Sequence, residues 1–282
     1  MPAETDDARG AYEYIKQYLR KHDIFDRIEA LVIYEAVFGE PYIPFTIREL
    51  SASERIALRK VLEKRVSGYP LQYIAGKWPF LDFELSVGEG VLIPRPDTES
   101  LAEICIEYLR NSVSPVVIDL CSGSGCLAIA VRRTVAESKV TAVEYHGSAL
   151  GYLEKNTAAN APDITVRKAD VFGFENLLAN SSVDMIICNP PYVTKKDYEK
   201  LAKELYYEPE PALTDGGDGL SFYRYISENY REKLKPGGFL MFEIGDNTGP
   251  AVTKILGDAT YRRIEIFNDS FGNPRIAAAV RD

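Results

Sequence analysis

From residue 115 onward the chain alternates short apolar runs with segments in which apolar residues recur at helical spacing. This alternation predicts a doubly wound α/β fold, a mostly parallel, seven-stranded, Rossmann-like sheet with helices on both faces. Ligands of such sheets bind at the carboxyl ends of the strands. The predicted strands cover residues 116–120, 140–144, 164–166, 183–188, 239–243, 264–267 and 276–280, and the predicted helices cover 127–135, 150–160 and 221–234, the last stopping at 235–238.

The chain before this alternating region has a different pattern. Residues 1–70 predict a small helical domain, because their apolar residues recur at helical spacing and Ser51 and Glu54 have the spacing of a capping box. Residues 71–93 predict a connecting β-hairpin linker, and residues 94–282 contain the α/β domain.

The hairpin and the segment after it carry finer predictions. Its two strands are expected over residues 73–78 and 80–85, where β-branched and aromatic residues are frequent. A proline-stiffened loop follows, and either Asp97 or Thr98 is expected to cap the helix that runs through residues 101–109.

Composition limits the classes of function. A formal net charge of −9 over 282 residues argues against nucleic acid as the main partner, because phosphate binding uses a basic face. Two histidines and four cysteines without a Cys-x-x-Cys pair predict no metal site and reduced thiols. With neither an apolar run of membrane-spanning length nor a signal-peptide pattern, we expect a cytoplasmic protein.

Asn189, Pro190, Pro191 and Tyr192 directly follow the predicted strand 183–188. The Asn189 side-chain oxygen and the carbonyl of Pro190, which has no N–H, are two neighbouring acceptors that complement a planar –NH2 group. Tyr192 could then lie over that flat group. The segment therefore favours an enzyme that modifies an amide or nucleobase nitrogen, and the alternative is a proline-stiffened turn.

A glycine-containing turn follows the first predicted strand of the α/β region. It opens a helix, and its glycines allow a close approach of the backbone to a ligand. A purely structural turn is the alternative interpretation. The segment consists of Asp119, Leu120, Cys121, Ser122, Gly123, Ser124 and Gly125.

Two acidic residues stand at the ends of the next two predicted strands. Glu144 lies about 20 residues after the glycines, where a carboxylate can accept from both ribose hydroxyls of a nucleoside. Asp170 can accept from an adenine amino group. Each alone is more often a helix cap or surface residue, but their order at successive strand ends indicates a nucleoside cofactor. Because the Gly-x-Gly-x-x-Gly fingerprint is incomplete, S-adenosylmethionine is favoured over NAD.

With these motifs the chain resembles class I S-adenosylmethionine-dependent methyltransferases that act on amino nitrogens. It is most similar to the peptide-chain release factor glutamine methyltransferase family, also called HemK or PrmC. The resemblance runs from about residue 8 to the end. It is carried by residues 71–74, 92–99, 119–125, 189–192, 208–213, 216–220, 236–238 and 243–245.

The resemblance implies transfer of a methyl group from S-adenosylmethionine to the glutamine of a Gly-Gly-Gln loop in release factors, giving S-adenosylhomocysteine. It implies that the helical domain helps to dock the release factor, and we expect a monomer. Asn189 and Pro190 would be catalytic and would bind the glutamine with Pro191 and Tyr192. The cofactor residues would be Asp119, Cys121, Ser122, Gly123, Ser124, Gly125, Glu144, Asp170, Val171 and Asn189.

Two positions depart from the family pattern. Cys121 stands where the family usually has glycine, and a side chain there could push the backbone away from the cofactor if the position needs a positive φ. Glu144 stands where aspartate is usual. Both departures bear on cofactor affinity more than on the reaction class.

Two other functions compete with this one. A DNA adenine or RNA amino methyltransferase would present the same –NH2 group to Asn189, after flipping the base out of its stack. A non-catalytic scaffold that docks on a release factor would result if Cys121 had spoiled the cofactor turn. Methyl-transfer assays and cofactor calorimetry discriminate among them.

Overall fold

The computed structural model describes residues 7–24, 26–44 and 48–282. Its internal contacts divide the chain into two compact units. The first contains Met1–Trp78 and Ala202–Tyr207, and the second contains Pro79–Leu201 and Glu208–Asp282. The predicted segments, with boundaries after residues 70 and 93, differ from these units, since residues 71–78 and 202–207 belong to the first one.

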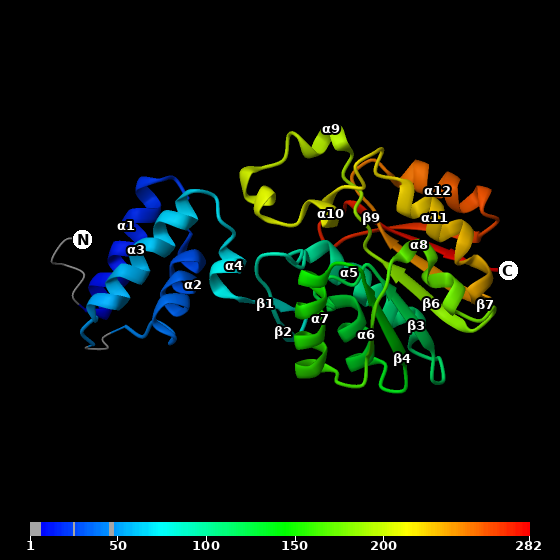
Figure 1. Ribbon diagram of the computed structural model, residues 1–282, viewed down its shortest axis with the longest axis horizontal. Coiled ribbons are helices and arrows are strands. Elements are labelled where there is room, and N and C mark those ends of the chain that lie inside the picture. The colour runs from blue at the N-terminus through cyan, green and yellow to red at the C-terminus, as the bar shows by residue number, and fades with distance from the viewer. Residues whose placement is uncertain (1–6, 25, 45–47) are drawn as a thin grey trace. The chain divides into compact units, whose positions relative to one another are not determined.

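The first unit is helical, as Figure 1 shows in blue and cyan. Its helices begin at capping residues: the Asp26 side chain accepts from two backbone N–H groups at the start of α2, and Ser51 and Glu54 form the predicted capping box. The elements are α1 (Ala8–Lys21), α2 (Arg27–Phe38), α3 (Ala52–Val66), α4 (Leu71–Ala75) and the 3₁₀ segment η3 (Lys203–Tyr207).

The apolar stripes of these helices form a core of their own. Ile15, Leu19, Ile33, Leu58 and Leu62 are fully buried in one cluster. Burial of a large aliphatic side chain contributes about 1.5–3 kcal/mol, so this cluster is a substantial source of stability for a small unit. The predicted helical domain is confirmed in its secondary structure.

The second unit contains a seven-stranded sheet of order β5-β4-β3-β6-β7-β9-β8, which confirms the predicted fold class. In this sheet β9 runs opposite to the other six strands. Strand order reverses around β3, so the carboxyl ends of β3 and β6 open a crevice there. The strands are β3 (Val116–Leu120), β4 (Lys139–Glu144), β5 (Thr165–Lys168), β6 (Val183–Cys188), β7 (Leu234–Glu243), β8 (Arg262–Asn268) and β9 (Pro274–Val280).

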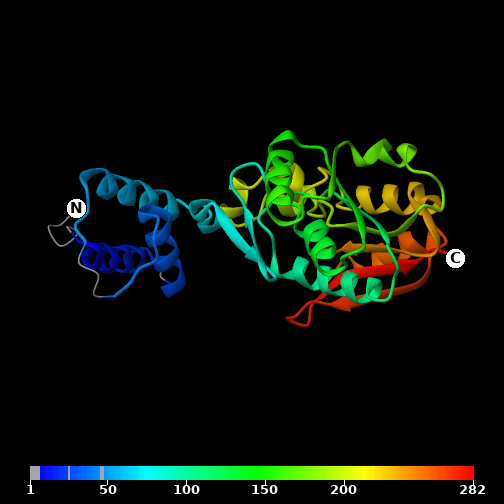
Figure 2. The ribbon, with the colours of Figure 1, turned by 90° about the horizontal axis from the view of Figure 1, so that it is seen from below.

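Helices cover both faces of this sheet (Figures 1 and 2). One layer is formed by α5, α6 and α7, and the other by α8, α11 and α12. Strands β3, β4 and β6 are buried for most of their length, as expected for parallel strands between two helical layers. The helices are α5 (Pro96–Leu109), α6 (Cys126–Thr134), α7 (Gly147–Asn160), α8 (Val171–Phe174), α9 (Lys195–Tyr198), α10 (Glu210–Leu213), α11 (Ser221–Asn229) and α12 (Gly249–Asp258).

The predicted strand over residues 73–78 is wrong for most of its length. Residues up to Ala75 form α4, which begins after Pro70 and ends at Gly76 with a φ of +70°, a left-handed helix end that glycine favours. The hairpin is shorter, with β1 over Lys77–Phe80 and β2 over Phe83–Ser86.

Two helix boundaries also differ from the predictions. Neither Asp97 nor Thr98 caps α5, because Pro96 begins the helix and its fixed φ suits the first helical position. The helix predicted over residues 221–234 ends at Asn229 and is followed by the 3₁₀ segment η4 (Arg231–Lys233). Residues 235–238 are part of β7, where the Gly237 N–H donates to the Arg281 carbonyl.

Candidate active site

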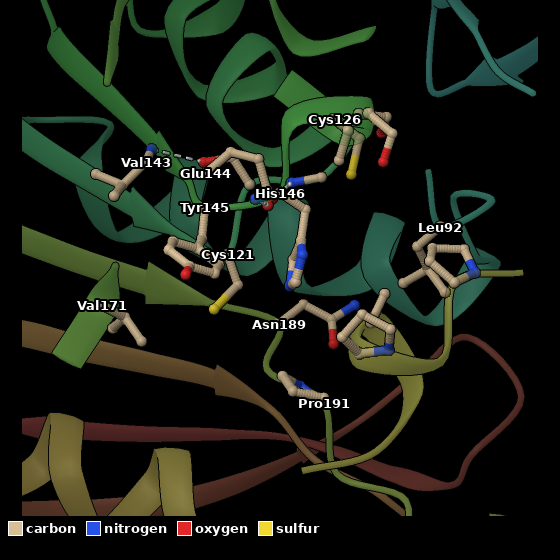
Figure 3. Close-up of a pocket in the computed structure, with 18 of the residues that line it drawn as sticks. Leu92, Cys121, Cys126, Val143, Glu144, Tyr145, His146, Val171, Asn189 and Pro191 are labelled. Carbon is tan, nitrogen blue, oxygen red and sulfur yellow. Dashed lines mark hydrogen bonds between the residues drawn. The ribbon is translucent and has the colours of Figure 1, made fainter. Parts of the chain in front are cut away.

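A pocket lies where β3, β4, β5 and β6 end, the edge at which the sequence predicted a ligand (Figure 3). Its walls come from several loops of the second unit. Of the predicted site residues, those lining it are Cys121, Ser122, Gly123, Ser124, Glu144, Asp170, Val171, Asn189 and Pro191. Asp119, Gly125, Pro190 and Tyr192 lie outside the lining.

The turn after β3 is formed by left-handed backbone conformations. Cys121, Gly123 and Gly125 have φ values of +58°, +54° and +87°. For a residue with a side chain, this conformation costs roughly 1–2 kcal/mol. Cys121 therefore stands at a position that favours glycine, and the strain anticipated from the sequence is present, yet the turn keeps its shape.

Hydrogen bonds along the backbone hold this turn. Ser122 is central, because its N–H donates to the Val143 carbonyl at 3.0 Å and its Oγ donates to the Asp119 carbonyl at 2.8 Å. The Val143 N–H donates back to Ser122 Oγ at 3.0 Å. The Gly125 N–H closes the turn on the Ser122 carbonyl at 2.8 Å. The turn is thus anchored to both β3 and β4.

Asp119 and Gly125 stabilise the turn but do not line the pocket. Asp119 is fully buried, its Oδ2 accepts from the Ala128 N–H at 3.2 Å, and burial raises its pKa to about 7. A Cβ added at Gly125 would lie 2.6 Å from Leu153 Cδ1, so a larger residue fits only if the Leu153 side chain, which extends from α7, moves.

Glu144 connects the end of β4 to the same turn. Its Oε2 accepts from the Gly123 N–H at 2.9 Å, and its Oε1 accepts from the His146 N–H at 2.8 Å. A carboxylate has about four acceptor sites, so two hydroxyls of a ligand can still be accepted. In Figure 3 the side chains of Tyr145 and His146 extend from the loop that follows.

Asp170 and Val171 form the pocket wall after β5. Asp170 caps α8 by accepting from the Phe172 N–H at 2.9 Å, the structural role that the sequence left open. Phe172 packs against Phe222, whose ring centroid lies 4.9 Å away and which lines the pocket. An apolar aromatic edge therefore adjoins the capping carboxylate.

Asn189 forms one side-chain hydrogen bond at the pocket wall. Its Nδ2 donates to Thr98 Oγ1 at 3.3 Å, and no described residue donates to its Oδ1. The amide is therefore oriented with its hydrogens toward Thr98. The side-chain oxygen remains available as an acceptor, as the sequence argument requires.

Tyr192 lies outside the pocket lining. Its hydroxyl donates to Glu243 Oε1 at 3.4 Å, and burial, with the nearby Glu243 carboxyl, raises its pKa. The prediction that its ring covers a substrate amide stays untested.

Two glycines press against the backbone and ring of Tyr192. A Cβ added at Gly219 would lie 2.2 Å from the Tyr192 carbonyl oxygen. One added at Gly245 would lie 2.7 Å from the Tyr192 ring. Both distances are too short for real contacts, so only glycine permits this close approach.

Sequence reasoning gave no role to part of the pocket wall. Glu208 ties two of the missed segments together, since its carboxylate accepts from the Ile93 N–H at 2.9 Å and from the Arg95 guanidinium. The segments 92–99 and 208–213 both carried the family resemblance, and that signal could have found them. The missed lining residues in these segments are Leu92, Pro94, Thr98, Pro209, Pro211 and Ala212.

Neither a metal cluster nor a membrane helix occurs in the described parts of the chain. No three His, Cys, Asp or Glu side chains gather there as they would around a metal ion. None of the helices in residues 7–24, 26–44 and 48–282 is long and apolar enough to cross a membrane.

Family models match two regions of the chain. Residues 97–237 match the model of the methyltransferase small domain, and residues 11–76 match the model of the PrmC N-terminal domain. The first match contains the ends of β3 to β6 that form the pocket.

Curated relatives match most of the chain. One from Fusobacterium nucleatum, named release factor glutamine methyltransferase, is 40% identical over 82% of this chain and 66% of its own length. Another of that name, from Bacteroides thetaiotaomicron, is 36% identical over 82% of this chain and 83% of its own.

A solved structure shows the same fold at low sequence identity. The hMettl16 catalytic domain, solved with a MAT2A 3′UTR hairpin, has a TM-score of 0.57 and 15% identity, covering 96% of this chain and 91% of that one. At this identity the likeness concerns the fold alone.

Proposed function

The chain belongs to the release factor glutamine methyltransferase family, and from this premise we propose its reaction and substrate. It transfers a methyl group from S-adenosylmethionine to the side-chain amide nitrogen of the glutamine in the Gly-Gly-Gln loop of peptide-chain release factors. S-adenosylhomocysteine is the leaving group, and one amide proton leaves after transfer. The observation that carries the proposal is the Asn189 amide, held with its N–H groups toward Thr98 and its oxygen available at a pocket wall.

The residues around the glycine turn fit the cofactor. A Cβ added at Gly123 would meet nothing within 4 Å, so the turn borders open space where a ligand can approach the backbone. Glu144 would accept from the ribose hydroxyls, and Asp170 and Val171 would lie against the adenine. When bound, S-adenosylmethionine supplies a methyl group activated by a positively charged sulfur.

Asn189 and Pro190 would hold the glutamine amide. An amide nitrogen is a poor nucleophile because its lone pair is delocalised into the carbonyl. The Asn189 Oδ1 and the Pro190 carbonyl would each accept one amide N–H, which fixes the nitrogen and favours positive charge developing on it. Aimed polar groups of this kind are typically worth about 10²–10³-fold in kcat.

The remaining parts of the proposal concern the partner. The release factor is a folded protein, and the helical unit would help to dock it while Pro191 and Tyr192 complete the glutamine site. A substrate that acts in translation places the reaction in the cytoplasm, and we propose that the enzyme works as a monomer.

Mass spectrometry of the substrate tests this proposal. Purified release factor is incubated with the enzyme and S-adenosylmethionine, digested and sequenced. The expected result is one added methyl group on the glutamine of the Gly-Gly-Gln loop. Parallel reactions with DNA and RNA use cofactor carrying a labelled methyl group. Label in either nucleic acid with none in the release factor would replace the proposal with the nucleobase alternative, and absence of cofactor binding would favour the scaffold.

A further inference from the structure

A buried carboxylate lies behind the pocket wall. Glu243, the last residue of β7, is 1% exposed. Its Oε2 accepts from Thr98 Oγ1 at 2.6 Å, and its Oε1 accepts from the Tyr192 hydroxyl at 3.4 Å. Thr98 in turn accepts from Asn189 Nδ2. Three segments far apart in the sequence therefore meet at one carboxyl group.

The direction of these hydrogen bonds follows from what each group can donate. An asparagine amide can turn by 180° and present either its oxygen or its NH2 group to a neighbour. A threonine hydroxyl has one hydrogen to donate. When the Glu243 carboxyl group is ionised, Thr98 donates that hydrogen to it, and only the lone pairs of the Thr98 hydroxyl face Asn189. Asn189 must then present its NH2 group to Thr98.

We infer that Thr98 and Glu243 are positioning residues that fix the amide of Asn189 with its oxygen toward the substrate. The inference rests on the proposed function, in which that oxygen accepts from the glutamine amide. With the opposite orientation Asn189 would offer a donor to a group that needs an acceptor. A wrongly turned amide would therefore lose the contact and also oppose the substrate N–H.

Tyr192 strengthens the same arrangement from the other side. It donates to the second oxygen of Glu243, so both carboxylate oxygens receive hydroxyl hydrogens. The Tyr223 hydroxyl donates to the Glu243 main-chain carbonyl at 2.8 Å, which holds this residue at the end of β7. Neither tyrosine supplies a hydrogen to Thr98 Oγ1.

Paired threonine variants test the inference in the full-length enzyme. Thr98→Val keeps the shape of the side chain and removes the acceptor for Asn189. Thr98→Ser keeps the hydroxyl. Thr157→Val is the matched control, since it removes another buried hydroxyl, one that donates to the Leu153 carbonyl within α7. Turnover on the release factor and the calorimetric Kd for S-adenosylmethionine are measured for each.

We expect Thr98→Val to lower kcat by about 10–100-fold, the range for loss of one or two oriented hydrogen bonds. The Kd for the cofactor should stay within about 2-fold of the wild-type value. Thr98→Ser and Thr157→Val should keep kcat within about 3-fold. This separation of kcat from cofactor binding, with rescue by serine, is not expected of a residue that only stabilises the fold.

The outcomes separate this inference from the proposed function. A wild-type enzyme that does not methylate the release factor overturns the proposed function and, with it, the inference. An active wild-type enzyme with an equally active Thr98→Val variant overturns the inference alone. If Thr98→Val does not fold, Glu243→Leu decides, since loss of the carboxyl group leaves the Thr98 hydrogen free to turn toward the Asn189 oxygen. A drop in kcat of about 5-fold or more supports the inference, and a smaller change overturns it.

Discussion

The two loops that meet at the pocket, residues 121–125 and 189–192, hold their shape by different means. The first is shaped by left-handed residues and by hydrogen bonds to the adjacent strands, some of which use Ser122 Oγ and the Glu144 carboxylate. In the second, Asn189 and Tyr192 depend on Thr98 and Glu243, which are 91 and 51 residues away from them in the chain. The difference teaches that a loop's shape can be local while a side chain's orientation is set by distant residues.

The largest expected effect removes the side chain on which the second loop's proposed chemistry depends. Asn189→Ala should lower kcat by about 10²–10³-fold, because one aimed acceptor is lost. Because the first loop is shaped independently, the calorimetric Kd for S-adenosylmethionine should change little. Near-wild-type turnover would contradict the role of Asn189, and a collapse of cofactor binding would show that the loops are not independent.

A smaller but still large effect should follow from a change in the first loop. Gly125→Ala places a Cβ 2.6 Å from Leu153 Cδ1 at a φ of +87°, so strain and overpacking together should lower the free energy of unfolding by ~3 kcal/mol. Urea denaturation measures this.

Gly123→Ala is the control, because its φ is +54° and no atom lies within 4 Å of the added Cβ. It should cost only ~1 kcal/mol. Equal losses in the two variants would mean that contact with α7 does not hold the turn.

Glu243→Gln tests the second loop's support through pH. Burial raises the pKa of Glu243 from 4.5 to about 7, and the nearby Asp97 carboxyl group adds to this increase. Hydrogen bonds from Thr98 and Tyr192 and the positive charge of Arg275 oppose this shift in part. The native state therefore binds more protons than the unfolded state between these values, and stability falls as pH rises through this window. In the wild-type protein, Glu243 should lower the free energy of unfolding by about 2–3 kcal/mol over this pH range, and this contribution should be absent from the variant.

Thermal unfolding of both proteins from pH 4.5 to pH 8 measures this difference. A residual slope is expected in the variant, because burial also raises the pKa of Asp119 to about 7. An unchanged slope would mean that Glu243 is not held as a buried acid.

The smallest expected effect comes from Cys121→Gly. Relief of the left-handed strain at a φ of +58° should raise the free energy of unfolding by about 1 kcal/mol. The greater chain entropy of glycine in the unfolded state and the loss of the Cys121 side-chain contacts reduce this gain. Cys121→Ala is the control, since it removes the thiol and keeps the Cβ. A gain in the alanine variant as large as in the glycine variant would show that the thiol, rather than the backbone, carries the strain.

The sequence predicted what depends on local pattern. Strand β6 was predicted at its observed bounds, because the apolar run of residues 185–188 stops directly before Asn189, and the sheet followed from alternation. The positive φ at Cys121 was anticipated from the glycine usual there. Local apolar content, in contrast, misled at residues 73–75, where Pro70 and Gly76 favour a short helix instead.

The rest could not be predicted because it depends on the folded sheet. Thr98 was expected as a possible helix cap, yet its hydroxyl donates to a carboxylate 145 residues away. Nothing near Glu243 in the sequence indicates that it lies behind Asn189 and Tyr192. Such contacts arise only when the ends of β6 and β7 lie side by side.

The close approach of Gly219 and Gly245 to Tyr192 has an evolutionary consequence. Gly219 lies against the main-chain carbonyl of Tyr192, and Gly245 lies against its ring. Residues 189–192 therefore have no space to move away from the pocket. A descendant enzyme that accepts a bulkier acceptor group would have to gain its space elsewhere in the pocket lining. Both glycines should therefore stay fixed in relatives that keep this placement of residues 189–192.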